Sequence, residues 1–136
     1  RYSMLAREPE NGLLDVLEAE GVGCIAFSPL RNGILTGRYL NGIPSDSRAA
    51  HDPRYLKPDM LTGELLEKVR LLNDIAAQRG QSLAEMALSW VLRKSQVTSV
   101  LIGASKPEQI IENCRIVSAA PFSSDELQRI DALTLA

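Results

Sequence analysis

Residues that build metal or disulfide sites are scarce in this sequence, and neither sign of charge dominates. Its 2 cysteines are too few for a disulfide framework, and its single histidine, His51, makes no zinc site without Asp or Glu. The 15 Lys and Arg against 17 Asp and Glu leave no basic excess for the phosphates of DNA or RNA. No run of about 18 apolar residues is present to span a bilayer. We therefore expect no nucleic acid, no membrane and no metal as partners.

Several catalytic and phosphate-binding motifs are also missing. The sequence contains no Gly-x-Gly-x-x-Gly, no Gly-x-x-x-x-Gly-Lys-Ser/Thr, no Gly-x-Ser-x-Gly and no His-Glu-x-x-His. A set of general acids and bases is hard to assemble, because His51 lies in an irregular stretch and fits a solvated residue better than a catalyst. These absences exclude the common signatures of nucleotide hydrolases, serine hydrolases and zinc proteases.

The apolar content predicts a packed core. Hydrophobic residues make up 45% of the chain and charged residues 24%, a balance typical of folded domains rather than disorder. A length of 136 residues suits one ordinary domain. The chain begins at Arg1 rather than Met, and no apolar segment follows a basic start as in a signal peptide. We expect a cytoplasmic protein, of which this chain is a piece.

Two continuous apolar runs predict the strands. Residues 22–27 are apolar without alternation, and residues 97–102 are similar apart from Thr98 and Ser99. The runs end at Ser-Pro and Gly, as expected of strands buried on both faces of a parallel sheet. Residues 1–5 form a shorter β-prone run, a candidate third strand. A closed barrel needs eight strands and an open doubly wound sheet five or six. We therefore expect the chain to be the latter part of a larger α/β protein.

Apolar residues at helical spacing predict five helices between and after these strands. Ser82 with Glu85, and Ser123 with Glu126, are capping boxes that mark two helix starts. Trp90 falls on the apolar face of its helix, which favours packing over a ligand platform. The helices are expected over residues 13–20, 61–79, 83–91, 107–119 and 124–133. Of these, the helix over 107–119 is expected to turn Ile110, Ile111, Cys114 and Val117 inward.

Ligands of parallel α/β folds bind in the loops after the strands, and the first such loop here follows Phe27. An aromatic ring at the end of a buried strand can stack on a flat ligand, although core packing is the commoner role. The stretch from Arg31 to Asp59 then has no regular pattern and several basic residues. Long loops of this kind are binding loops or lids, and the basic residues favour an anionic ligand. An ordinary solvated loop is the alternative.

The second strand is followed by a glycine and a helix start. Gly103 lets a ligand approach the backbone, and Ser105 is placed as an N-cap whose box is completed by Glu108. Free N–H groups and the positive dipole end there suit a phosphate, with Lys106 as an added cation. An ordinary helix cap is the alternative. Three polar residues that share the next helix face can hold an adenine or ribose, or can simply be solvated: Gln109, Glu112 and Asn113.

Three segments together resemble the C-terminal part of the aldo-keto reductase superfamily. Residues 21–30 are similar to its seventh strand and aromatic-Ser-Pro-Leu end, residues 33–39 to the Gly-x-Leu-Thr/Ser-Gly-Lys-Tyr segment, and residues 102–113 to the eighth strand and nucleotide-binding helix. Residues 1–5 and 42–48 resemble the branch of bacterial L-glyceraldehyde 3-phosphate and methylglyoxal reductases, relatives of potassium-channel β subunits. The resemblance covers essentially the whole chain.

This resemblance implies a fold, a cofactor and a reaction. Residues 1–136 would be the C-terminal part of one (β/α)8 barrel domain, about strands 6 to 8, with the N-terminal half absent. The parent protein would bind NADP(H) and reduce aldehydes or ketones, such as methylglyoxal or glyceraldehyde 3-phosphate, by hydride transfer. The alternatives are a channel-associated regulatory subunit that binds NADPH and an inactive truncated product.

The resemblance also implies a set of cofactor-binding residues. Phe27 would stack on the nicotinamide, Arg48 would lie over the cofactor in a closing loop, and Ser105 with Lys106 would read the 2′-phosphate. The full set consists of Phe27, Ser28, Pro29, Leu30, Arg31, Asn32, Arg38, Arg48, Gly103, Ser105, Lys106, Gln109, Glu112 and Asn113.

No residue of this chain is expected to be catalytic. The family's Asp, Tyr, Lys and His lie on the first four strands of the barrel, and Tyr2, Tyr39 and Tyr55 stand in no matching motif. The chain alone is therefore predicted to be inactive. A partial barrel exposes strand edges and an apolar face, so we expect it to aggregate or to form a homo-oligomer when produced alone.

Overall fold

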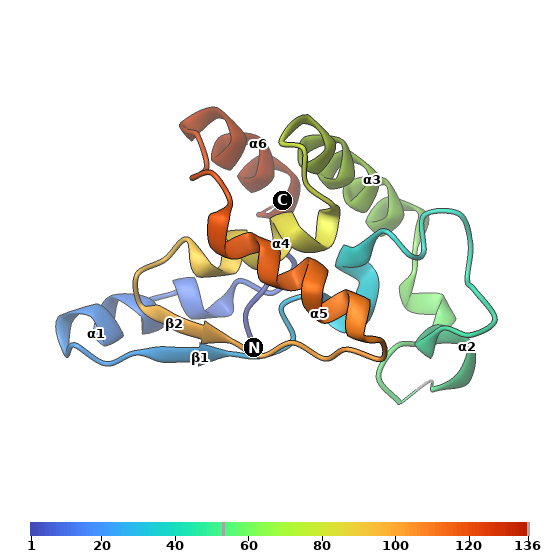
Figure 1. The fold of residues 1–136 in the computed structure, drawn as a ribbon, viewed down its shortest axis with the longest axis horizontal. Helices are drawn as coiled ribbons and strands as arrows, with labels where there is room; N and C mark the ends of the chain where they lie inside the picture. The colour runs from blue at the N-terminus through green and yellow to red at the C-terminus, as the bar shows by residue number, and fades with distance from the viewer. Residues whose placement is uncertain (53, 136) are drawn as a thin grey trace.

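The computed structural model describes residues 1–52 and 54–135, with the side chain of Arg48 excepted. Two parallel strands and a set of helices form one α/β unit (Figure 1). The α-helices and strands are α1 (Leu13–Ala19), β1 (Cys24–Ala26), α2 (Arg48–His51), α3 (Gly63–Gln78), α4 (Leu83–Leu92), β2 (Val97–Val100), α5 (Pro107–Cys114) and α6 (Ser124–Thr134). Short 3-10 turns are η1 (Glu8–Glu10), η2 (Arg31–Thr36), η3 (Pro58–Met60) and η4 (Arg115–Ser118).

Strands β1 and β2 pair in parallel, as predicted, with Cys24 opposite Val97 and Ala26 opposite Val100. The prediction that both faces would be buried is wrong. Ala26 is buried, whereas the next residue back, Ile25, is 65% exposed. Burial of a strand on both faces requires a layer on each side, and the described residues cover only one face of this sheet.

The third strand expected over residues 1–5 does not form. Ser3 and Ala6 instead exchange backbone hydrogen bonds across a tight turn, at 3.0 and 3.1 Å. The Tyr2 N–H donates to the Phe27 carbonyl at 3.3 Å, so the chain start lies beside the end of β1. Tyr2, Ser3 and Met4 are buried. The apolar side chains of this run therefore serve the core without adding to the sheet.

Helix α4 lies at the centre of the molecule, between the sheet and the pair formed by α3 and α6 (Figure 1). Trp90 is completely buried on it, which confirms its predicted packing role. The capping box of Ser82 and Glu85 is present at its start, and α6 begins with the equivalent box of Ser123 and Glu126. The core is built largely of apolar side chains from α4, α3, η2 and the chain start, with single residues from α1, α2, α6 and both strands.

A partly buried ion-pair network ties the chain start to α4 and α6. Glu10 accepts hydrogen bonds from the Tyr2 hydroxyl, from Arg7 at 2.6 Å and from Arg93 at 2.9 Å, while Arg7 also donates to Asp131 at 2.6 Å. Burial by itself favours the protonated form of Glu10, but the hydrogen bonds from its three donors outweigh it and hold its pKa below the ordinary value. These contacts fix segments far apart in sequence to one another.

Helix α5 places its apolar face away from the core, contrary to prediction. Ile110, Ile111 and Cys114 are exposed, as is Val117 in the η4 turn that follows, and Asn113 on the opposite face of α5 is buried. Because α5 packs on α4 through its polar face, the apolar face is left without a covering element among the described residues. Periodicity identified an apolar stripe correctly, but it does not say which neighbour covers it.

No helix in the described part of the chain is long and apolar enough to cross a membrane.

Candidate functional site

A cavity of about 550 Å³ lies at the carboxyl ends of the two strands. Its walls come from the loop after β1, the first turn of α4, the loop after β2 and the polar face of α5. In Figure 1 the segments that leave both arrowheads run toward the start of α5. This is the edge at which parallel α/β folds bind their ligands.

Most of the residues predicted to bind a cofactor meet in this cavity. Its lining includes Ser28, Pro29, Leu30, Asn32, Arg38, Gly103, Ser105, Gln109, Glu112 and Asn113. These residues come from the segment after β1 and from the loop after β2 with α5, more than sixty positions apart in the sequence, brought together because β1 pairs directly with β2.

Three other predicted residues, Phe27, Arg31 and Lys106, do not line the cavity. Phe27 is 53% exposed at the end of β1. The fourth, Arg48, is the first residue of α2, and its side chain lies outside the described residues.

The backbone after β1 is held in an unusual conformation. Ser28, Arg31 and Asn32 have φ angles of 58°, 47° and 58°, in the left-handed region that non-glycine residues rarely adopt. The buried side chains of Ile34 and Leu35 anchor the turn that follows. Strained backbone of this kind clusters at ligand sites, where it presents particular atoms to the ligand.

Asn32 connects this loop to the irregular stretch beyond it. Its side-chain amide donates to the Tyr55 carbonyl at 2.8 Å. The second such connection is an ion pair of 2.6 Å between Arg38 Nη2 and Asp46 Oδ1. The hydrogen bond from Arg38 and the positive charges of Arg38 and Lys106 lower the pKa of Asp46 below its ordinary value. Two polar residues of the cavity are thus already engaged by the segment 41–57.

The start of α5 differs from the predicted Ser105–Glu108 box. The helix begins at Pro107, and Lys106 occupies the N-cap position. Gln109 folds back so that its side-chain oxygen accepts from the Ser105 N–H at 2.8 Å and the Lys106 N–H at 3.3 Å. The expectation of free N–H groups at this helix start is therefore wrong for these two residues, because the glutamine already satisfies them.

Gly103 leaves open space in the cavity wall. A Cβ added there would meet no described atom within 4 Å, and its φ lies outside the left-handed region. Neither conformation nor packing within this chain requires a glycine at that position. The backbone at Gly103 is therefore open to the cavity.

Sequence reasoning missed several lining residues. They are Gly33, Thr36, Tyr39, Asp46, Ser82, Ala84, Ile102 and Ala104. Gly33, Thr36 and Tyr39 belong to the Gly-x-Leu-Thr-Gly-x-Tyr segment, which was the signal available for them. A lone aspartate in a basic loop carries no such signal, so Asp46 could be found only from the structure.

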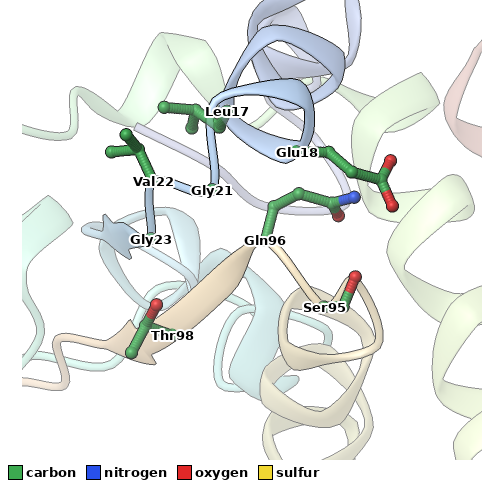
Figure 2. A pocket seen from close by; sticks show the side chains of 8 residues that line it. All are labelled: Leu17, Glu18, Gly21, Val22, Gly23, Ser95, Gln96 and Thr98. Atoms are coloured by element: carbon green, nitrogen blue, oxygen red, sulfur yellow. The ribbon is translucent and has the colours of Figure 1, made fainter.

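A smaller cavity, of about 340 Å³, lies at the opposite edge of the sheet (Figure 2). It is bordered by the end of α1, by Gly23 before β1 and by Gln96 and Thr98 around the start of β2. Gly23 is required there, because a Cβ would lie 2.2 Å from the Thr98 hydroxyl oxygen. The amino ends of parallel strands serve stability rather than catalysis in barrel folds, so we assign no ligand to this cavity.

Two parallel strands, helices on one face and a cavity at the strand carboxyl ends are typical of α/β proteins that bind ligands at this edge. The Aldo/keto reductase family model matches residues 1–134. The chain therefore belongs to the aldo/keto reductase family.

Among its relatives is the L-glyceraldehyde 3-phosphate reductase of Escherichia coli K12, which is 54% identical over 134 residues, 96% of this chain and 39% of that protein. A putative voltage-gated potassium channel subunit beta of Schizosaccharomyces pombe is 38% identical over 138 residues, 98% of this chain and 40% of that protein. The chain thus spans about four-tenths of the length of these relatives.

Solved structures confirm the fold. The glycerol dehydrogenase of Gluconobacter oxydans superposes with a TM-score of 0.76 at 25% identity, over 97% of this chain and 40% of its own. An aldo-keto reductase in complex with epalrestat superposes with a TM-score of 0.66, over 98% of this chain and 38% of its own. The fold is that of part of a (β/α)8 barrel, as predicted.

Proposed function

We propose that this chain forms the NADP(H)-binding side of an enzyme that reduces small aldehydes or ketones to alcohols. The observation that carries the proposal is the cavity at the strand ends, which gathers residues from both predicted cofactor loops. The 54% identity to a protein named L-glyceraldehyde 3-phosphate reductase supports small aldehydes as substrates.

The residues around the cavity fit a dinucleotide in size and chemistry. A volume of about 550 Å³ lies within the range of small-molecule sites, about 300–1,000 Å³. Arg38 offers a guanidinium fork for a phosphate, and Gly103 leaves room for a ligand against the backbone. Glu112 and Asn113 offer an acceptor and an amide for the ribose or adenine end.

When bound, NADPH supplies the hydride for carbonyl reduction. The chain's own residues would hold and orient the cofactor: Arg38 at the phosphates, the left-handed loop of Ser28 and Asn32 along one side, and Phe27 beside the nicotinamide. An exposed aromatic ring at the end of β1 is free to offer its face to a flat ring. Lys106, outside the lining, would reach the 2′-phosphate from the start of α5, which would favour NADPH over NADH.

Isothermal titration of the purified 136-residue chain tests this proposal. NADPH should bind, and should bind more tightly than NADH. Phe27→Ala should weaken NADPH binding while leaving binding of 2′,5′-ADP unchanged, because the adenosine half does not reach the nicotinamide subsite. Absence of NADPH binding by the folded chain would contradict the proposal.

We further propose that the chain has no reductase activity of its own, since no residue here is assigned a catalytic role. Purified chain mixed with NADPH and methylglyoxal should show no loss of absorbance from NADPH. Oxidation of NADPH above the rate without protein would contradict this. The expected cytoplasmic location and homo-oligomer stay predictions.

A second candidate function rests on a separate comparison. Proteins named as potassium channel β subunits match at 36–39% identity over most of this chain. The same cofactor cavity would then report NADPH occupancy to a channel rather than serve rapid turnover. Steady-state turnover of the parent protein with small aldehydes separates the two candidates, since a regulatory subunit should turn over slowly while still binding NADPH.

A further inference from the structure

We infer that Asp46 limits the affinity of the cavity for phosphates by holding Arg38 in an ion pair that a bound phosphate must displace. The inference deepens the proposed function and rests on it. It makes Asp46 a residue that sets affinity through Arg38, without itself donating to the ligand.

The geometry places the two residues in direct competition with a ligand. Arg38 Nη2 lies 2.6 Å from Asp46 Oδ1, and both residues line the cavity. A carboxylate accepts from a guanidinium through the same kind of oxygen as a phosphate does, with similar distances. Asp46 engages one guanidinium nitrogen, Nη2, so a phosphate that binds both prongs of the guanidinium fork must displace it.

The charges that line the cavity make this competition matter for the affinity for an anion. Among the lining residues that the structure describes, Arg38 is the only Lys or Arg, whereas Asp46 and Glu112 are both acidic. Within this lining, an anionic ligand therefore meets two carboxylates and one cation that is already paired, while Lys106 stands outside it. Removing the Asp46 charge would both free Arg38 and remove a like charge from the wall.

Two of the backbone donors near the cavity are already engaged. The N–H groups of Ser105 and Lys106 are held by Gln109, so the start of α5 offers less to a phosphate than an open helix terminus would. Asp46 is free to move, since its side chain is 76% exposed at the rim of the cavity. Its displacement by a ligand therefore disrupts no core packing.

Asp46→Asn tests this inference, with NADPH and inorganic pyrophosphate as probes in isothermal titration of the 136-residue chain. The variant should bind each probe about fivefold more tightly than the wild type, a change in keeping with one exposed charge pair. Glu67→Gln is the matched control. Glu67 pairs with Arg70 at 2.7 Å on α3, outside the cavity lining, so the same loss of charge should leave both affinities unchanged.

A double-variant cycle separates competition from simple charge removal. If Asp46 acts through Arg38, then Asp46→Asn should give little gain in an Arg38→Met background. A gain as large as in the wild-type background would overturn the inference. Unchanged binding by the single variant Asp46→Asn would also overturn the inference. Weaker binding would do so as well, because it would show that Asp46 orients Arg38 for the ligand.

These failures are distinct from failure of the proposed function. If the wild type binds NADPH but Asp46→Asn does not improve it, only the present inference is lost. If neither the wild type nor Asp46→Asn binds either probe while both are folded by circular dichroism, the proposed function is overturned and this inference falls with it.

Discussion

The guanidinium carbon of Arg93 lies 3.6 Å from the centroid of the Trp90 ring. The same guanidinium donates to the Tyr2 hydroxyl at 2.8 Å and to Glu10 at 2.9 Å. One side chain thus covers the largest aromatic residue of the core and completes the ion-pair network at the chain start. Cation–π contact and charged hydrogen bonds act here on the same group.

Arg93→Met should lower the free energy of unfolding by about 1–2 kcal/mol, because it removes a partly buried charged donor from Glu10 and Tyr2. Arg70→Met is the control, since the exposed pair of Arg70 with Glu67 on α3 should contribute less than about 0.5 kcal/mol. Urea unfolding followed by circular dichroism measures both. Equal effects of the two changes would contradict a special role for Arg93.

The low pKa of Glu10 predicts a loss of stability in acid. Its folded pKa lies below its ordinary value, so its contribution is present above that value of 4.5 and is lost as the pH falls through the folded pKa. The free energy of unfolding should therefore fall below about pH 4.5. Glu10→Gln should make this fall shallower. If the free energy of unfolding falls equally with pH in the wild type and in Glu10→Gln, then other carboxylates cause the loss of stability in acid.

The rearranged start of α5 makes Gln109, rather than Ser105, the capping side chain. Gln109→Ala should lower the free energy of unfolding by about 1 kcal/mol, since it exposes two backbone donors. Ser105→Ala should lower the free energy of unfolding by clearly less than Gln109→Ala does. Ser123→Ala is a positive control of about 1 kcal/mol, because Ser123 caps α6 in a complete box. Thermal unfolding without ligand ranks the three variants. A larger loss of stability in Ser105→Ala than in Gln109→Ala would show that Ser105 is the capping residue, as the sequence predicted.

Gly103→Ala should separate binding from stability. The added methyl meets no described atom, so the melting temperature should not fall, whereas NADPH affinity should drop by about tenfold or more as the methyl enters the ligand space. Gly63→Ala on α3 is the matched control, since Gly63 also has open space and lies outside the cavity lining. Unchanged affinity in Gly103→Ala would mean that no ligand approaches this backbone.

Gly23→Ala should destabilise the chain by about 1–2 kcal/mol, because its methyl would press on the Thr98 hydroxyl across the small cavity of Figure 2. Thr98→Ala removes that oxygen and should recover most of the loss in the double variant. The coupling is read from urea unfolding of the two single variants and the double variant. Strictly additive effects would contradict the contact.

Local chemistry was the part of this fold that sequence reasoning predicted well. The capping boxes of α4 and α6 depend on residues three positions apart, and the helix faces that include Val69 and Trp90 follow from spacing alone. The parallel pairing of β1 with β2 also followed, because two apolar runs separated by helices have few other arrangements.

Predictions that depended on neighbours far along the chain were less successful. Ile25 and Ile110 were expected inside, yet each lies on a face that the described residues leave uncovered. At the site, the loops after both strands, where a ligand was expected, do line the cavity, while cofactor binding there stays a prediction. The Asp46 partner of Arg38 was not, because an ion pair between two loop residues leaves no periodic or motif signal in the sequence.

The central position of α4 has a consequence for how this protein can vary over evolutionary time. Its buried residues, Leu83, Met86, Ala87, Leu88, Trp90 and Val91, face partners on several sides at once. A substitution that changes side-chain volume there requires compensating substitutions in more than one other element. Substitutions in α4 should therefore be rare and accompanied by substitutions in its neighbours, whereas those on the outer face of α3 should be frequent and independent of one another.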